Sequence, residues 1–82
     1  MTEEQRAVVL ELVAQACGSD QVLAEPDVDL LDAGLLDSLA MVELLVGIEE
    51  RLGVEIPPTD VDRTELSSVT KIVAFVDGRL GR

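Results

Sequence analysis

Apolar residues recur at helical spacing near the start of the chain. The first such segment has its apolar positions three and four residues apart, at Val9, Leu12, Val13 and Ala16. Thr2 is a good N-cap before this pattern, and Gly18 supplies the left-handed residue that often ends a helix. The pattern therefore predicts an amphipathic first helix over residues 2–17.

A second segment, residues 38–52, carries two apolar stripes instead of one. The main stripe is Met41, Leu44, Leu45, Ile48 and Leu52. The second stripe alternates with acidic residues and consists of Leu39, Val42 and Val46, interleaved with Glu43, Glu49 and Glu50. A protein core accounts for the first stripe. The second either packs under a loop or faces a partner, and the pattern does not choose between them.

The C-terminal third begins with Pro57 and Pro58, which prevent the second helix from continuing. Residues 59–66 predict a short helical turn. Ser67 or Ser68 then caps a last helix that closes at Gly81, with its apolar stripe at Val69, Ile72, Val73, Val76 and Leu80. We expect an all-α fold without strands: a small bundle of three main helices plus one short helix.

The long segment between the first two helices, residues 19–37, is irregular but not polar. Pro26, Gly34 and five aspartates favour turns. Its apolar residues are too numerous for a free loop: Val22, Leu23, Val28, Leu30, Leu31, Leu35 and Leu36. We expect these side chains to hold the loop against the helices. Loops of this length are usually functional.

The composition points to a single domain spanning residues 1–82, with 48% apolar residues and one aromatic. The net charge of −11 argues against binding to nucleic acid or to an anionic membrane surface. It serves either solubility or the steering of basic partners. The N-terminus lacks the layout of a signal peptide and no apolar run is long enough to span a membrane, so we expect a cytoplasmic monomer.

Several kinds of chemistry lack the residues they need. Without histidine there is no His-based triad and no His-ligated metal site. Cys17 is alone and falls on the apolar side of the first helix, where it suits a small buried hydrophobe. The acidic loop fails as a calcium-binding EF-hand, because its twelfth position counted from Asp27 is a serine instead of a glutamate. We predict no catalytic residue and no metal site.

Ser38 is the residue whose role is open. Asp and Ser are both leading helix caps, and in isolation such a pair is more often structural than functional. If Asp37 is the cap, however, Leu36 and Met41 form a hydrophobic staple and Ser38 becomes the first helical residue. Its hydroxyl is then not needed for capping, and it lies at the positive helix end, which favours an attached phosphate.

The stretch around this serine, LLDAGLLDSLAMVELLVGIEERLGVEIPP, closely resembles the acyl carrier and peptidyl carrier proteins. Their signature is a glycine, two residues and then Asp-Ser-Leu at the start of the second helix. The resemblance extends to the helix lengths, the long first loop, the EE pair and the Ile-Pro after the second helix.

The resemblance implies that Ser38 carries a 4′-phosphopantetheine arm, added from coenzyme A with magnesium by a phosphopantetheinyl transferase that also recognises Asp37. The arm's thiol would hold an acyl or aminoacyl group as a thioester. An adenylating ligase or acyltransferase would load it, and a downstream enzyme would accept it. The family's docking positions correspond here to Leu39, Val42, Glu43, Val46, Glu49 and Glu50, which favours exposure of the second stripe.

The resemblance leaves the cargo open. The stretches GLLDS and TDVDRTELSSVTKIV are similar to the D-alanyl carriers of teichoic acid modification, although ELSSV departs from those carriers. A composition typical of GC-rich genomes points instead to a polyketide or nonribosomal peptide pathway, which we take as the main interpretation. D-alanyl transfer is the alternative. The competing class of protein is an unmodified helical interaction domain.

Overall fold

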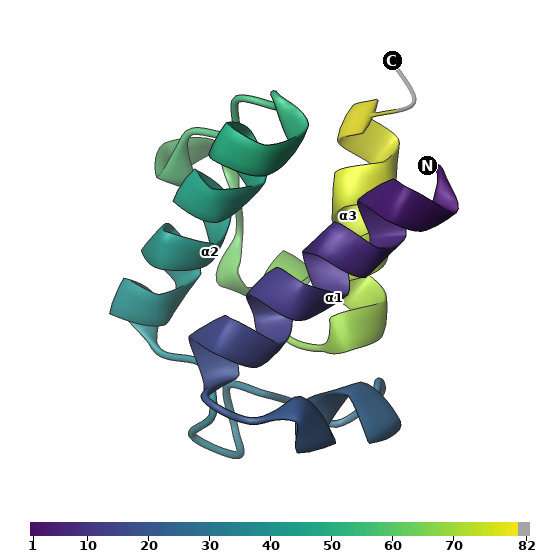
Figure 1. Ribbon diagram of the computed structural model, residues 1–82. Helices are drawn as coiled ribbons and strands as arrows, with labels where there is room; N and C mark the ends of the chain where they lie inside the picture. Colours follow the sequence, from purple (N-terminus) through teal and green to yellow (C-terminus); the bar gives the residue numbers. More distant parts are fainter. Residues whose placement is uncertain (81–82) are drawn as a thin grey trace.

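The computed structural model describes residues 1–80, and this part of the chain is all-helical, as predicted (Figure 1). It contains three α-helices and three 3₁₀ turns, in the order α1 (Glu3–Cys17), η1 (Asp20–Ala24), α2 (Ser38–Leu52), η2 (Pro58–Asp60), η3 (Arg63–Leu66) and α3 (Val69–Leu80). The sequence predicted the bounds of all three α-helices to within one residue at the ends that are described. The predicted end at Gly81 lies outside the described residues.

The ends of the helices follow from local capping. The Thr2 side chain accepts a hydrogen bond from the backbone N–H of Gln5, whose own side chain accepts one from the Thr2 N–H, so α1 begins with a capping box. Gly18 ends α1 with φ = 74°, a conformation that favours glycine. At α3, Ser68 is the cap, because its Oγ accepts a hydrogen bond from Lys71 N at 3.2 Å.

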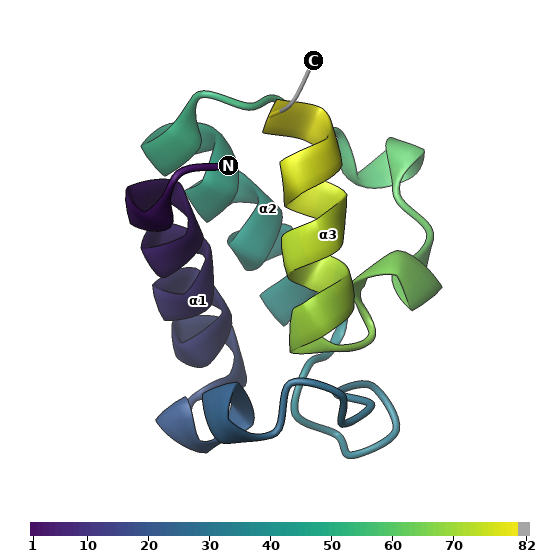
Figure 2. The ribbon, with the colours of Figure 1, turned by 90° about the vertical axis from the view of Figure 1, so that its right-hand side faces the viewer.

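The core is aliphatic and consists mainly of side chains from the three helices, with Leu30 of the loop and Leu66 of η3 added. Figure 2 shows how the three helices are arranged. Its fully covered large side chains are Leu30, Leu44, Ile48, Leu66, Ile72, Val9, Val13 and Val76. Gly47 lets α1 and α2 approach closely: a Cβ added there would lie 2.9 Å from Leu12 Cδ2. The main stripes predicted for the three helices therefore meet in one core.

The loop between α1 and α2 is held against the start of α3. Leu30 N donates to Ser67 O at 2.6 Å, and Thr70 N donates to Pro26 O at 3.0 Å. The expectation that apolar side chains hold this loop is confirmed for its buried members, Val22, Leu30 and Leu36. It is wrong for Val28 and Leu35, which are 37% and 38% exposed. The loop packs on the core with one side only, so the side chains on its other side stay exposed.

The segment after α2 contains two short turns, η2 and η3, where the sequence predicted one. Asp62 caps η3, and its Oδ1 accepts hydrogen bonds from both Thr64 N at 3.1 Å and Thr64 Oγ1 at 3.0 Å. These bonds favour the charged carboxylate and lower the pKa of Asp62. Within residues 1–80, no helix is both long and apolar enough to cross a membrane.

Candidate functional site

Ser38 is the first residue of α2, and its side chain is exposed. Figure 1 shows the junction at which the long loop enters α2. The capping position belongs to Asp37, whose backbone is extended and whose Oδ1 accepts a hydrogen bond from Ala40 N at 2.8 Å. Within the described residues the Ser38 hydroxyl makes no hydrogen bond. The two roles considered for this Asp-Ser pair are therefore divided, as the sequence predicted, and the hydroxyl is available.

The residues around Ser38 hold its backbone in place. Leu36 and Met41, on either side of the cap, are 2% and 7% exposed, in agreement with the predicted hydrophobic staple. The backbone N–H groups of Leu35 and Leu36 both donate to Leu30 O, at 2.9 and 3.1 Å. The serine is thus presented from a fixed turn, so a group attached to it starts from a defined point.

The electrostatics at this end of α2 suit a phosphodiester. The first backbone hydrogen bond of the helix runs from Met41 N to Asp37 O at 2.9 Å, so the N–H groups of Ser38 and Leu39 point out of the helix end without an intrahelical acceptor. Together with the helix dipole they favour a negative group on the serine oxygen. An exposed hydroxyl at a positive helix end fits the attachment of 4′-phosphopantetheine through its phosphate.

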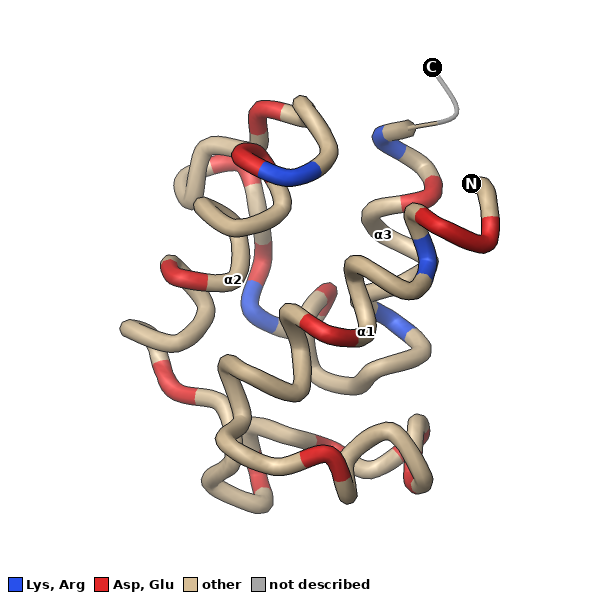
Figure 3. The backbone as a smooth tube through the Cα atoms, viewed as in Figure 1, with Lys and Arg blue, Asp and Glu red and all other residues tan. Residues whose placement is uncertain are grey.

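The second stripe of α2 is exposed, which answers the question that its pattern left open. Leu39, Val42 and Val46 are 68%, 42% and 45% exposed. The three glutamates interleaved with them are also exposed. Figure 3 marks several acidic positions along α2. Among the described residues, the one ion pair that α2 makes joins Arg51 and Glu11 at 3.9 Å, which leaves these glutamates unpaired. Whether partners dock on this surface stays a prediction.

Cys17 is half-buried at the end of α1 and packs against the core. Burial raises the pKa of its thiol, which reduces the fraction of reactive thiolate at neutral pH. Its position agrees with the expected role as a small hydrophobe, although its burial is partial.

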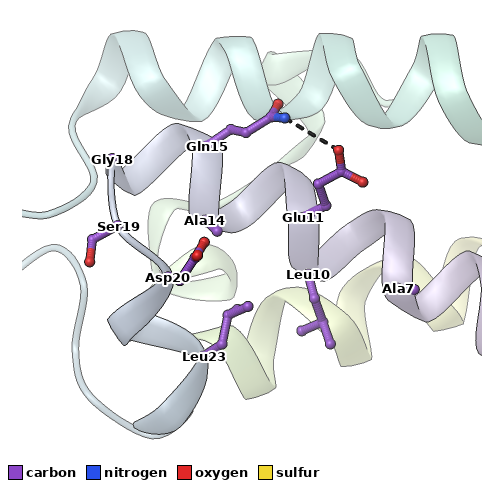
Figure 4. A pocket seen from close by; sticks show the side chains of 9 residues that line it. All are labelled: Ala7, Leu10, Glu11, Ala14, Gln15, Gly18, Ser19, Asp20 and Leu23. Carbon is purple, nitrogen blue, oxygen red and sulfur yellow. Dashed lines mark hydrogen bonds between the residues drawn. The ribbon is translucent and has the colours of Figure 1, made fainter.

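Sequence reasoning did not find an open groove of about 760 Å³ between α1 and η1 (Figure 4). Leu10 and Leu23 contribute apolar side chains to it, and Glu11 and Gln15, joined by a 3.4 Å hydrogen bond, lie along α1 above them. The only signal in the sequence was that Leu10 flanks the main stripe of the first helix. Ser38 does not line this groove.

Comparison with known proteins finds matches that cover most of the chain. Residues 7–76 match the family model described as "Phosphopantetheine attachment site", a range that contains α2 and the loop before it. A D-alanyl carrier protein of Bacillus velezensis is 45% identical over 65 residues, which are 79% of this chain and 83% of that protein. D-alanyl carrier protein 1 of Lactiplantibacillus plantarum is 39% identical over 75 residues, 92% of each chain. The D-alanyl carrier protein of Enterococcus faecalis is 41% identical over 69 residues, 84% of this chain and 88% of that protein.

Proposed function

Because the chain belongs to the phosphopantetheine-attachment family of acyl and peptidyl carrier proteins, we propose that Ser38 is its attachment residue and that residues 1–82 act as one carrier domain. Proteins of this family are not enzymes. They hold 4′-phosphopantetheine covalently and interact with a transferase, a loading enzyme and an acyl-accepting enzyme. When bound, the group supplies a thiol that carries the cargo as a thioester on a flexible tether.

The observation that carries this proposal is the exposed Ser38 hydroxyl beside a cap that Asp37 already provides. In the proposed roles, Ser38 Oγ forms the bond to the phosphate and the N-terminus of α2 stabilises the phosphate charge. Asp37 fixes the helix start on which the transferase acts. Loss of any one of these features would affect attachment without changing the core.

We propose that the cargo is a D-alanyl group. The support is the set of D-alanyl carrier proteins that align with most of this chain at 39–45% identity. This evidence favours D-alanyl transfer, which the sequence suggested as the alternative. The polyketide or nonribosomal peptide pathway was supported by composition alone. The loading enzyme is then a ligase that activates D-alanine as an adenylate before transfer to the thiol.

The exposed surface of α2 is the proposed docking site for these enzymes. Leu39, Val42 and Val46 supply apolar contact, and the glutamates between them attract basic partner surfaces. Because this surface is on the helix that begins with Ser38, an enzyme docked there would be next to the arm.

Attachment is tested by incubating the protein with coenzyme A, magnesium and a phosphopantetheinyl transferase of broad specificity. Intact mass should rise by one phosphopantetheine group, and Ser38→Ala should abolish the increase. Ser19→Ala is the matched control, because Ser19 also stands at a helix start but serves as the cap of η1. If the folded wild-type protein gains no mass, the chain is an unmodified interaction domain and the carrier proposal fails.

The cargo is tested on the modified protein with a D-alanine-activating ligase and ATP. D-alanine should be loaded on the arm thiol at a rate that L-alanine and larger amino acids do not reach. A modified protein that rejects D-alanine but is loaded by adenylating enzymes for other amino acids would refute the D-alanyl proposal and leave attachment intact.

Docking is tested by charge reversal in the loading reaction. Glu43→Lys and Glu49→Lys should each slow loading by several fold at low salt, and the loss should shrink as salt screens the charges. Glu55→Lys changes the net charge equally but lies beyond the end of α2. If all three variants load at the same rate, the glutamates serve solubility instead of docking.

A further inference from the structure

A small hollow of about 130 Å³ lies in the loop before Ser38, and Ser19 is the one residue that its lining shares with the groove of Figure 4. It is lined by Ser19, Gln21, Val22, Glu25, Val28, Leu30 and Leu35. Its volume corresponds to about four water molecules at roughly 30 Å³ each. A branched alkyl group of a few carbon atoms fits such a space.

The walls of this hollow are fixed by hydrogen bonds in the loop. The backbone N–H of Leu30 donates a hydrogen bond to Ser67 O at 2.6 Å, and the carbonyl of Leu30 accepts one from the N–H of Leu35 at 2.9 Å. Asp29 Oδ1 accepts the N–H groups of the next turn, those of Leu31 and Asp32, at 3.0 Å each. The hollow is therefore preformed, so occupying it costs little ordering of the protein.

Two exposed apolar side chains that do not belong to the core lie at the hollow. Apart from Met1 and the docking stripe of α2, Val28 and Leu35 are the large apolar residues of the described chain that are classed as exposed. Both line the hollow. Leu35 also lies three residues before Ser38 in the sequence, so this apolar surface includes a residue near the attachment point.

We propose that the hollow is a resting site for the neutral part of the phosphopantetheine arm when the carrier is free, an inference that rests on attachment at Ser38. Three residues of chain span at most about 11 Å, which limits the separation of the Cα atoms of Leu35 and Ser38. The arm has about fourteen bonds of roughly 1.5 Å between the serine oxygen and the sulfur, so it is long enough to reach.

The chemistry of the hollow selects this part of the arm. The carboxylate of Glu25 disfavours an anion, so the phosphate stays at the N-terminus of α2, and the dimethyl and alkyl groups beyond it meet Val28 and Leu35. The side-chain amide of Gln21, which has no hydrogen-bond partner within residues 1–80, is available to the arm's amides. A tethered group has an effective concentration in the millimolar range, so even a weak contact is populated.

The proposal is tested by NMR on the modified carrier with labelled Val and Leu methyl groups. We expect nuclear Overhauser contacts between arm protons and the methyls of Val28 and Leu35, with chemical-shift changes relative to the unmodified protein. Leu10 and Leu23, in the other groove, should not change. Val28→Ser should remove most of these contacts. Val46→Ser, at a valine of α2 that is 45% exposed against 37% for Val28, should leave them in place.

Contacts to Val42 and Val46 instead would overturn the proposal and place the arm along α2. The absence of any contact, with unchanged loop shifts, would overturn it and leave the arm in solvent. Both results come from wild-type protein whose mass already shows the attached group, so they leave the proposed function standing. Failure of attachment itself is seen separately, as the missing mass increase.

Discussion

Replacement of Asp37 separates its capping role from its charge. Asp37 Oδ1 accepts the Ala40 N–H at 2.8 Å, and this is the side-chain hydrogen bond that caps α2. Asp37→Ala removes both the bond and the negative charge at the helix start. Asp37→Asn keeps a good cap and removes only the charge.

The magnitudes follow from the exposure of the cap. Because water replaces the lost acceptor at an exposed helix end, Asp37→Ala should cost about 1 kcal/mol for the cap, in a range of about 0.5–2. The lost charge–dipole interaction adds about 0.3–1 kcal/mol. For a domain of this size each kcal/mol lowers Tm by about 4–8 °C, so Asp37→Ala should unfold several degrees below wild type and Asp37→Asn within a few degrees of it.

Two measurements on each variant check this reasoning: thermal unfolding followed by circular dichroism, and kcat/KM of the transferase for Ser38. Asp37→Ala should lose stability and modification rate together. If Asp37→Asn keeps its Tm but is modified slowly, the transferase recognises the carboxylate itself. An Asp37→Ala protein with unchanged Tm and unchanged amide exchange in the first turn of α2 would refute the capping assignment.

Three further predictions concern other parts of the molecule. Gly47→Ala should destabilise the fold by about 1–3 kcal/mol relative to Gly78→Ala, because its Cβ would lie 2.9 Å from Leu12 Cδ2, whereas both alanines gain the same helix propensity. A Cβ at Gly78 meets nothing within 4 Å, so Gly78→Ala should stabilise the fold by about 0.5–1 kcal/mol. If the two variants unfold at the same urea concentration, α1 and α2 do not approach closely at Gly47. Iodoacetamide at pH 7 should alkylate the arm thiol before Cys17, whose raised pKa limits its thiolate, as peptide mass mapping would reveal. The pKa of Asp62 is lower in the folded protein than its unfolded value of about 3.9, so the charged carboxylate stabilises the fold above that pH, and this stability is lost as the pH falls through the folded pKa. Asp62→Ala should therefore have a lower Tm than wild type at neutral pH and the same Tm in acid. A Tm difference that does not change with pH would exclude this linkage.

Much of the fold and of the site was predictable because its determinants are local. Helix starts and ends depend on the conformations of a few neighbouring residues, so Thr2, Gly18 and Asp37 mark boundaries that can be recognised from the sequence alone. The separation between a capping Asp37 and an available Ser38 follows from the same short stretch. The cargo was not predictable in this way, because amino-acid composition does not indicate which group the thioester holds. Composition favoured a polyketide or nonribosomal peptide pathway, whereas the similar proteins are D-alanyl carriers.

The sequence by itself determined which residues share a face of each helix, since the helical period fixes that within one element. Only the tertiary structure decided which faces are covered. Leu39 and Val42 resemble core residues in pattern, yet α1 and α3 pack on the opposite side of α2 and leave them exposed. Val28 and Leu35 are likewise as apolar as Leu30, but the buried side of the loop is already occupied. Burial depends on where distant segments meet, and no local pattern contains that information.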